Sequence, residues 1–294
     1  MKLGTFFSGI GAPEFAIKSL GIPHDVEFAC DDDPFVKETY MANHRCKNFY
    51  DDITSIKEIP SVDLLVFGFP CQPFSFAGTR GGLKDKRGTL VLNALDLMRK
   101  NKPKMFIAEN VEGLLDIEGG RVLASLVKSM KRMGYKVSYE VLNSLDFGIP
   151  QSRKRLWIVG TQGEFSFPEK HPDTTPHLAE FLDEEVDENV FATRSFLAKP
   201  KVAQRLRSYT NPYINCITQT ICRNGSSSEY ISYVAAVNNA IGQARKPTIK
   251  ECCRLFDLPD EFVFPDSVSA TRRYAMLANS MVVAVLKSLI GRML

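Results

Sequence analysis

One cysteine of this sequence stands in surroundings that favour chemistry. Cys71 lies in the segment Gly-Phe-Pro-Cys-Gln-Pro-Phe-Ser at 68–75, where Pro70 and Pro73 stiffen the backbone on both sides. A lone cysteine is usually a buried, inert thiol, but the flanking glycine and prolines support a displayed nucleophile at least as well. We therefore treat Cys71 as a candidate nucleophile.

An acid and an alternating row of polar residues occur further along the chain. Glu109 follows an apolar run and opens the segment Glu-Asn-Val at 109–111, so it can share a pocket with the cysteine. Gln151, Arg153 and Arg155 alternate, and an extended backbone would present them on one side as a polar, cationic row. A solvent-facing strand would explain the same alternation.

Glycines and aspartates near the start of the sequence indicate a nucleoside-bearing cofactor. Phe-Ser-Gly-Ile-Gly at 7–11 allows close backbone approach to a ligand, although a third glycine is missing and a simple tight turn would also fit. Asp31 and Asp32 follow about 20 residues later, where an acid would bond ribose hydroxyls. Asp52 is a further candidate. Helix capping is the alternative role of these aspartates.

The candidate groups follow predicted strands in roughly the first 160 residues. Apolar runs predict strands at 3–7, 26–30, 62–67, 105–108, 135–142 and 156–159. Helical periodicity predicts helices at 35–44, 90–99 and 121–133. The alternation predicts an α/β fold with a mostly parallel sheet, in which ligands bind beyond the carboxyl ends of the strands.

The rest of the chain is less regular. Residues 163–246 break into polar stretches with an acidic run and a basic run, which indicates a second, irregular domain. Thr248 and Glu251 form a capping-box pattern that opens a short helix, and Asn279 is expected to cap a final helix at 281–290. We expect one domain at 1–163 and 262–294, a second domain at 164–245 and a hinge segment at 246–261.

Composition excludes several classes of protein. In 294 residues, 44% are hydrophobic and 24% charged, which is typical of a globular chain rather than a disordered or fibrous one. Apolar stretches are too short for a membrane span, and no secretory signal is evident, so we expect a cytoplasmic protein. Seven cysteines without a C-x-x-C pair predict neither a disulfide framework nor a zinc site. The net charge of +3 does not by itself indicate nucleic acid.

Together, these segments resemble the DNA (cytosine-5) methyltransferase family of bacterial or phage type, over nearly the whole chain apart from about 164–245. The matching motifs occur in the family's order at 7–11, 68–75, 85–90, 109–111, 151–155, 250–260 and 279–280. The Pro-Cys-Gln segment is the most specific. Four positions depart from the family pattern, namely Thr5, Ala12, Asp31 and Ala278.

The resemblance implies a Rossmann-like S-adenosylmethionine-dependent methyltransferase domain with a smaller target-recognition domain. Its activity would be transfer of a methyl group from S-adenosylmethionine to carbon 5 of a cytosine flipped out of a specific duplex DNA sequence. Cys71 would add to carbon 6, Glu109 would bond ring N3, and Arg153 and Arg155 would hold the acid and the base. S-adenosylhomocysteine would be the product, and no metal is expected.

The resemblance also implies two sets of binding residues. The cofactor residues would be Phe7, Ser8, Gly9, Ile10, Gly11, Asp31, Asp32, Asp52, Ile53, Phe69, Pro70, Leu90, Asn279 and Ser280. The DNA-binding residues would be Gln72, Ser75, Arg80, Arg87, Gln151, Arg205, Arg207 and Arg223. The expected partners are double-stranded DNA and a companion restriction endonuclease that acts separately. We expect a monomer with no membrane partner.

Three other functions remain open at this stage. A transfer RNA cytosine-5 methyltransferase shares the scaffold, and Cys216-Ile217-Thr218 is close to the Cys-Phe-Thr segment of the eukaryote-type members. A nicotinamide oxidoreductase would explain the glycines and Asp31 but would leave the Pro-Cys-Gln and Glu-Asn-Val segments without a task. A catalytically silent DNA-binding module would leave Cys71 and Glu109 unexplained.

Overall fold

The computed structural model describes residues 1–70, 86–171, 176–186, 207–208, 212–218, 234–235 and 244–294. The chain divides into two compact units. Unit 1 comprises Met1–Leu142, Lys154–Glu169 and Val285–Leu294, and unit 2 comprises Asn143–Arg153 and Lys170–Ala284. Unit 2 thus includes residues on both sides of the expected recognition domain, and each unit is described by itself below.

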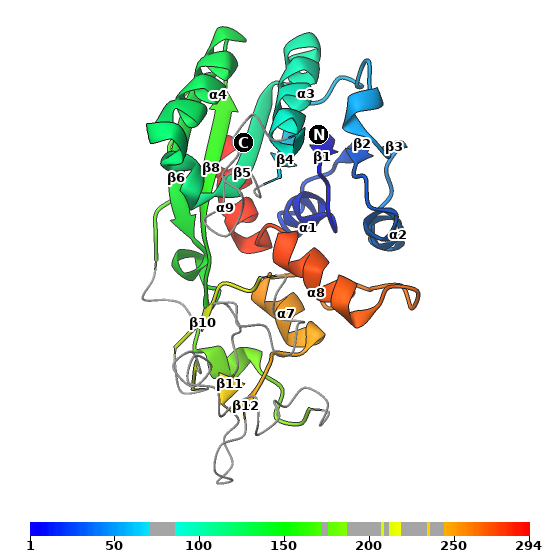
Figure 1. Cartoon of the computed structure of the whole chain (residues 1–294), viewed down its shortest axis with the longest axis vertical. Helices are drawn as coiled ribbons and strands as arrows, with labels where there is room; N and C mark the ends of the chain where they lie inside the picture. Colours follow the sequence, from blue (N-terminus) through cyan, green and yellow to red (C-terminus); the bar gives the residue numbers. More distant parts are fainter. Residues whose placement is uncertain (71–85, 172–175, 187–206, 209–211, 219–233, 236–243) are drawn as a thin grey trace. The chain divides into compact units, whose positions relative to one another are not determined.

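Unit 1 is built on a seven-stranded sheet in the order β3-β2-β1-β4-β5-β8-β6 (Figure 1). Its strands are β1 (Lys2–Phe6), β2 (Asp25–Cys30), β3 (Asn48–Tyr50), β4 (Leu64–Gly68), β5 (Met105–Val111), β6 (Lys136–Asn143) and β8 (Lys154–Thr161). Strands β3, β2, β1, β4 and β5 pair in parallel, and β8 is antiparallel to β5. The predicted strands and the mostly parallel sheet are confirmed. The parallel strands bring their carboxyl ends to one edge.

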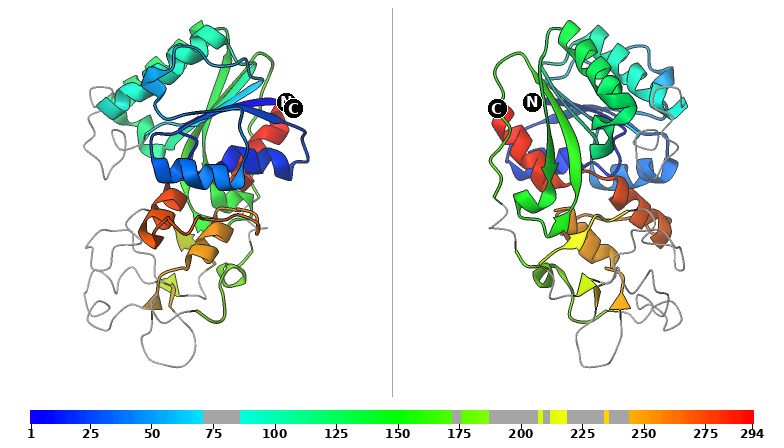
Figure 2. Two further views of the ribbon diagram at one scale, coloured as in Figure 1. Left: turned by 90° about the vertical axis from the view of Figure 1, so that its right-hand side faces the viewer. Right: turned by 60° about the vertical axis from the view of Figure 1, so that its left-hand side comes forward.

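Helices cover both faces of this sheet, as Figure 2 shows for α3 and α4 on one face and α1, α2 and α9 on the other. The bounds are α1 (Ala12–Ser19), α2 (Pro34–Asn43), α3 (Lys86–Asn101), α4 (Arg121–Arg132) and α9 (Val283–Met293). Short 3-10 helices are η1 (Ile53–Ser55), η3 (Glu112–Leu115) and η4 (Ile117–Gly120). Apolar residues of α3 and α4, such as Met98 and Met130, pack with Phe67 and Phe106 of the sheet in one buried cluster. The sheet is therefore buried on both faces, as a parallel sheet requires.

Unit 2 contains little regular structure in its described part. Its elements are η5 (Ser144–Phe147), β7 (Gln151–Ser152), η7 (Leu178–Phe181), β9 (Arg207–Ser208), β10 (Ile214–Asn215), β11 (Val234–Ala235), β12 (Ala244–Arg245), α7 (Ile249–Leu255) and α8 (Ala270–Asn279). The predicted capping box is present at the start of α7, where Thr248 and Glu251 bond each other's backbone amides. Two-residue strands bury little surface by themselves, so other contacts must hold this unit together.

The end of the chain differs from the prediction. Helix α8 was not expected from sequence, and Asn279 is its last residue rather than the cap of the final helix, which begins only at Val283. The span Ala270–Met293 is long and apolar enough to cross a membrane, but 72% of its most apolar window is buried inside the protein. The α8–α9 segment is therefore part of the buried core.

Candidate active site

The loop that follows β1 turns sharply and exposes its backbone on one side. Gly9 and Gly11 adopt positive φ angles of 55° and 82°, which favour glycine. A Cβ atom added at Gly9 would meet nothing within 4 Å, whereas one at Gly11 would lie 2.2 Å from Nε2 of His44. Gly9 therefore has open space beside its backbone, and Gly11 allows close packing against His44, which follows α2.

Asp31, at the end of β2, is bonded directly to this loop. The Gly9 N–H donates to Oδ2 of Asp31 at 2.9 Å, and the Asp33 N–H donates to Oδ1 at 3.3 Å. Burial is the main cause that raises the pKa of Asp31 to about 6, while the two backbone bonds act in the opposite direction. The glycine loop and the first aspartate were predicted separately from sequence, and the structure joins them by hydrogen bonds. Ser8 attaches the same loop to β2, because its N–H donates to the Cys30 carbonyl and its Oγ accepts the Cys30 N–H.

The other acids of this edge are less involved with the loop. Asp32 is exposed, and Asp33 caps α2 through the Phe35 N–H. Asp52 caps η1, because its carboxylate accepts from the N–H and the hydroxyl of Thr54, and these bonds lower its pKa. Helix capping therefore accounts for the contacts of Asp52 here, although its exposed carboxylate is open to a ligand as well.

The segment that leads to Cys71 is fixed by Asn110. Cys71, Gln72, Ser75 and Arg80 lie outside the described residues, but Phe69 and Pro70 are described. The buried Asn110 donates from Nδ2 to the Phe69 carbonyl at 3.0 Å and accepts the Val111 N–H. Asn110 had no role in the sequence prediction. A buried asparagine in an otherwise apolar strand must find partners, and that rule is the signal that could have pointed to it.

Glu109 lies on β5 beside the end of β4. Its backbone is in register with Gly68, and its carboxylate pairs with Nε of Arg155 at 3.1 Å. The side chains of Glu109 and Arg155 are 12% and 17% exposed, so the pair is largely shielded but reachable. Of the two arginines predicted to hold this acid, Arg155 contacts it, and Arg155 also neighbours Val111 across the β5–β8 pair.

Arg153 and Gln151 make different contacts, so the expected single cationic row is divided. Arg153 is buried and donates to the carbonyls of Ile217, Ala278 and Ser280, with its guanidinium 5.1 Å from the Phe256 ring. Gln151 is fully buried; it donates to the Leu255 carbonyl and accepts the Ile217 N–H. Gln151 and Arg153 therefore form an anchor within unit 2, and of the three alternating residues Arg155 is the one that contacts Glu109.

The contacts of Arg153 also account for the segment that had kept an RNA substrate open. Arg153 Nη1 lies 3.4 Å from Sγ of Cys216 and donates to the Ile217 carbonyl. Ile217 is fully buried. Cys216 and Ile217 therefore belong to the anchor of unit 2.

The remaining predicted residues are placed as follows. Leu90 is half-buried on α3, Ile53 is buried on η1, and Ser280 is buried after α8, where its hydroxyl donates to the Met281 carbonyl. Asn279 is exposed at the end of α8. Arg205 and Arg223 lie outside the described residues, and only the backbone is described for Arg87 in α3 and Arg207 in β9.

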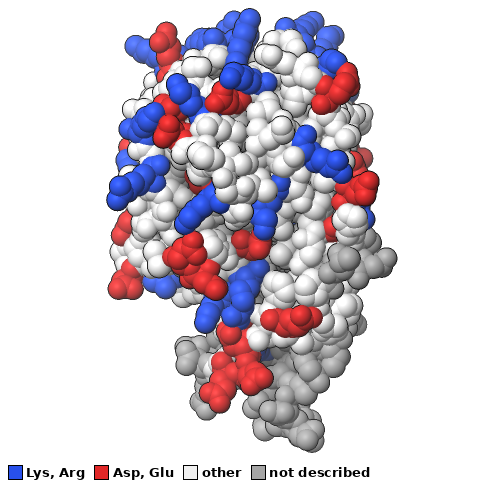
Figure 3. Space-filling model, turned by 180° about the vertical axis from the view of Figure 1, so that it is seen from behind, with Lys and Arg blue, Asp and Glu red and all other residues white. Residues whose placement is uncertain are grey.

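Surface features add little to this site. On the face shown in Figure 3, lysine and arginine side chains lie among aspartates and glutamates, so charge alone does not mark a site for a polyanion there.

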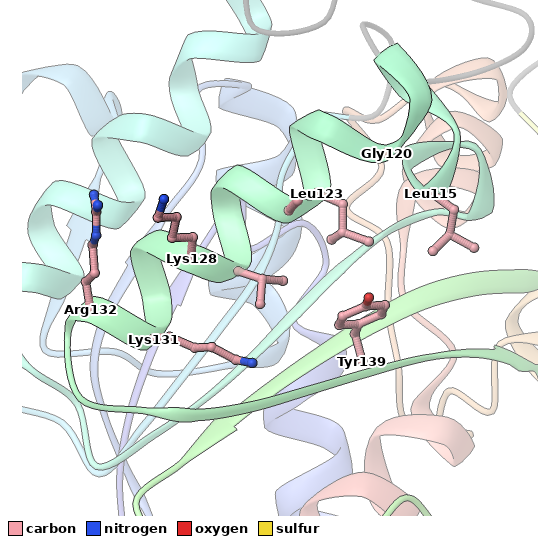
Figure 4. Close-up of a pocket in the computed structure, with 9 residues that line it drawn as sticks. Leu115, Gly120, Leu123, Lys128, Lys131, Arg132 and Tyr139 are labelled. Carbon is pink, nitrogen blue, oxygen red and sulfur yellow. The ribbon is translucent and has the colours of Figure 1, made fainter.

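A cavity of about 650 Å³ is lined by α4 and Tyr139 of β6, with Lys128 and Lys131 beside apolar side chains (Figure 4). None of its lining residues is a predicted site residue. Within the described residues, no cluster of three His, Cys, Asp or Glu could hold a metal ion.

Comparisons with known proteins define the class to which this fold and site belong. The S. pombe Dnmt2 methyltransferase superposes with a TM-score of 0.82 over 99% of this chain and 97% of its own, at 21% identity, which establishes the fold. The type II methyltransferase M.NgoBI of Neisseria gonorrhoeae is 34% identical over 98% of this chain and 91% of its own length. The type II methyltransferase M.HaeII of Haemophilus aegyptius is 34% identical over 100% and 92%.

Residues 1–294 match the family of C-5 cytosine-specific DNA methylases, and the chain belongs to this family. It is a DNA (cytosine-5-)-methyltransferase. The family uses S-adenosylmethionine as its methyl donor, and the open backbone at Gly9 beside the Asp31 carboxyl fits such a nucleoside-bearing cofactor. Family membership favours DNA over transfer RNA as the substrate.

Proposed function

We propose that this enzyme methylates carbon 5 of a cytosine flipped out of a specific duplex DNA sequence, through a covalent adduct of Cys71 at carbon 6. The carrying observation is the register of β4 and β5, which pairs Gly68 with Glu109. Cys71 follows Gly68 by three residues, and three residues span at most about 11 Å. The candidate nucleophile and acid therefore start from neighbouring strand ends.

The chemistry explains why a thiol and an acid are needed together. Carbon 5 of cytosine is a weak nucleophile, so the Cys71 thiolate first forms a bond to carbon 6 while Glu109 bonds or protonates ring N3. The resulting enamine carries electron density to carbon 5, and bound S-adenosylmethionine supplies the electrophilic methyl group there. A water molecule then takes the carbon 5 proton, the electrons of that C–H bond re-form the double bond between carbons 5 and 6, and Cys71 leaves carbon 6 as a thiolate.

Residues around the reacting groups have positioning tasks in this proposal. Arg155 orients the Glu109 carboxylate through their 3.1 Å contact. Asn110 fixes the Phe69 carbonyl, two residues before Cys71, and so limits the positions of the nucleophile. We also propose Arg153 as a positioning residue, because its N–H groups donate to the backbone carbonyls of residues 217, 278 and 280 rather than to Glu109.

We further propose that the cofactor lies over the Gly9 loop, with Asp31 bonding the ribose hydroxyls and Asp52, Phe69 and Leu90 completing the site within unit 1. Support comes from the open space at Gly9 and from the bond of its N–H to the partly buried Asp31 carboxyl. Ile10 and Gly11 contribute differently, since Ile10 is buried and Gly11 packs against His44. No metal enters the proposed reaction.

The choice of target is assigned to residues 164–245. This segment carries Arg205, Arg207 and Arg223 with several asparagines and glutamines, the side chains best suited to read base edges. The relatives named above are type II methyltransferases, so we propose a modification role that protects sites from a separate restriction endonuclease. We retain the predictions of a monomeric, cytoplasmic enzyme.

Transfer of labelled methyl groups tests the proposed substrate. Purified enzyme with labelled S-adenosylmethionine should label duplex DNA and not transfer RNA, and bisulfite sequencing should locate 5-methylcytosine within one short sequence. The proposal would be refuted if the enzyme transferred label to RNA and none to DNA. Replacing 164–245 by the segment of a relative with another target should change the methylated sequence; an active chimera that keeps the original target would place readout elsewhere.

A further inference from the structure

A carboxyl group is buried directly beneath the glycine loop. Glu14 occupies the first turn of α1, three residues beyond Gly11, and is only 2% exposed. It stands among buried apolar neighbours on its own helix, namely Phe15, Ala16 and Ile17. An ionised carboxylate in such a place is costly unless several donors or a cation compensate it.

Both hydroxyl contacts of Glu14 converge on one oxygen of its carboxyl group. The Tyr40 hydroxyl donates to Oε1 at 2.6 Å, and the Thr5 hydroxyl lies 3.3 Å from the same oxygen. Among the described residues, Oε2 is buried without a hydrogen-bond partner. The two bonds to Oε1 favour the ionised form and so act against burial, which leaves burial and the unpartnered Oε2 as the features that favour the neutral acid. Burial is the dominant cause that raises the pKa of Glu14 to about 7.

A chain of hydrogen bonds connects this acid to the cofactor loop. Thr5 Oγ1 lies 2.7 Å from Ser8 Oγ, which accepts the Cys30 N–H at 2.8 Å. Ser8 precedes Gly9, whose N–H is bonded to Asp31. Glu14 thus reaches both strand ends, β1 through Thr5 and β2 through Ser8, that present the loop and Asp31.

We propose that Glu14 is a positioning residue for cofactor binding: as a neutral acid it fastens the 7–11 loop to β1 and α2, and its ionisation loosens this loop and weakens the grip on S-adenosylmethionine. The inference rests on the proposed cofactor site. An ionised Glu14 would leave a charged Oε2 without a donor, and relief would require water or a shift of α1, which begins at the loop itself.

Other charged and titratable groups lie near Glu14 on α1, on and after α2, and after β2. On α2, burial raises the pKa of Tyr40 well above its usual value and lowers that of His44 to about 4, so both are neutral near pH 7. Burial also raises the pKa of Cys46, after α2. Lys18, on the last turn of α1, is exposed. Asp31 titrates at about 6 and in the opposite functional sense, because its ionised form is the one that bonds ribose.

The test is binding of S-adenosylhomocysteine, measured by calorimetry from pH 5.5 to 8.5, for wild type and Glu14→Gln. Glutamine keeps the accepting oxygen for Tyr40 and Thr5 and cannot ionise. We expect equal affinities near pH 6.5 and a wild-type affinity about tenfold lower at pH 8, with Glu14→Gln retaining its affinity. The ligand's own amino group titrates in both proteins, so the difference isolates Glu14.

Glu27→Gln serves as the matched control. Glu27 is another buried acid of unit 1, on β2, but it pairs with Lys47 and has no bond to the loop network. Its variant should follow the wild-type pH profile. Urea unfolding at pH 5 and pH 8 supplies a second readout: because the folded pKa of Glu14 lies above the usual 4.5, wild type should lose stability over this interval relative to Glu14→Gln.

Two results would overturn the inference. Parallel loss of affinity in wild type and Glu14→Gln above pH 7 would show that Glu14 does not govern it. Weak binding by a folded Glu14→Gln at every pH would show that the charge is required. Asp31→Ala keeps failures apart, because normal binding by that variant at pH 6.5 would reject the proposed cofactor site itself.

Discussion

Arg155 and Arg153 are two residues apart but belong to regions with opposite properties. In unit 1, groups at the strand ends are accessible to a ligand, because Gly9 faces open space and Glu109 is partly exposed beside Arg155. In unit 2, Arg153 and Gln151 are buried, and their side chains are bonded to backbone carbonyls and amides. Polar groups with accessible surface are available for chemistry, whereas buried polar groups bonded to the backbone hold a fold together.

A second anchor in unit 2 extends this contrast. Glu251 is fully buried and forms two 2.8 Å bonds to Arg245, while it also accepts the Asp183 and Thr248 amides. Arg254 completes the network through Asp183. Strands of two residues form few backbone hydrogen bonds, so such side-chain networks stabilise this unit in their place.

The largest expected effect on stability follows from removing one partner of this buried pair. Glu251→Gln should destabilise the protein by about 3–5 kcal/mol, because the Arg245 guanidinium stays buried without its charged partner. Urea unfolding measures the change. Asp51→Asn is the matched control, since Asp51 is 70% exposed in its pair with Lys37 and should matter by less than about 1 kcal/mol. Equal effects would break the distinction between the two regions.

Glu109→Gln should act on the reaction rather than on the fold. We expect turnover to fall about 100-fold or more, within the range for a general acid, with cofactor affinity and unfolding free energy nearly unchanged. Single-turnover methylation and calorimetry separate the two quantities. A variant that loses cofactor binding as much as turnover would remove Glu109 from its proposed role.

A smaller effect concerns the pH dependence of cofactor binding on the acidic side. The pKa of Asp31 is raised to about 6, so lowering the pH through 6 protonates it and removes the carboxylate that bonds the ribose. S-adenosylhomocysteine affinity should fall about fivefold between pH 6 and pH 5. Asp31→Asn should bind weakly at all pH values without this slope. A slope that persists in the variant would assign the titration to another group.

The sequence predicted the elements that carry their own signal. Apolar runs such as 26–30 and 105–108 became strands, and their order along the chain indicated the edge of the sheet at which Gly9, Asp31 and Glu109 lie. Helix α8 escaped prediction because its first turn holds Thr271, Arg272 and Arg273, which hide the apolar face that begins at Tyr274.

Contacts between distant residues could not be predicted from spacing. Gln151 and Arg153 look like a surface row with Arg155, and only the fold shows that their partners lie more than 60 positions away, at Ile217 and Leu255. Glu14 is a similar case: its burial depends on Tyr40 of another helix. Long-range partners decide whether a polar residue is structural or functional, and local pattern carries no information about them.

Covalent trapping tests the central claim most directly. A duplex with 5-fluorocytosine at the target position cannot release the carbon 5 substituent as a proton, so the bond between Cys71 and carbon 6 should persist. With S-adenosylmethionine, the wild-type enzyme should form a DNA adduct that survives denaturing electrophoresis, and peptide mapping should locate it at Cys71. Cys71→Ala should form none. An adduct at wild-type level in Cys71→Ala, or one mapped to another residue, would contradict the proposed mechanism.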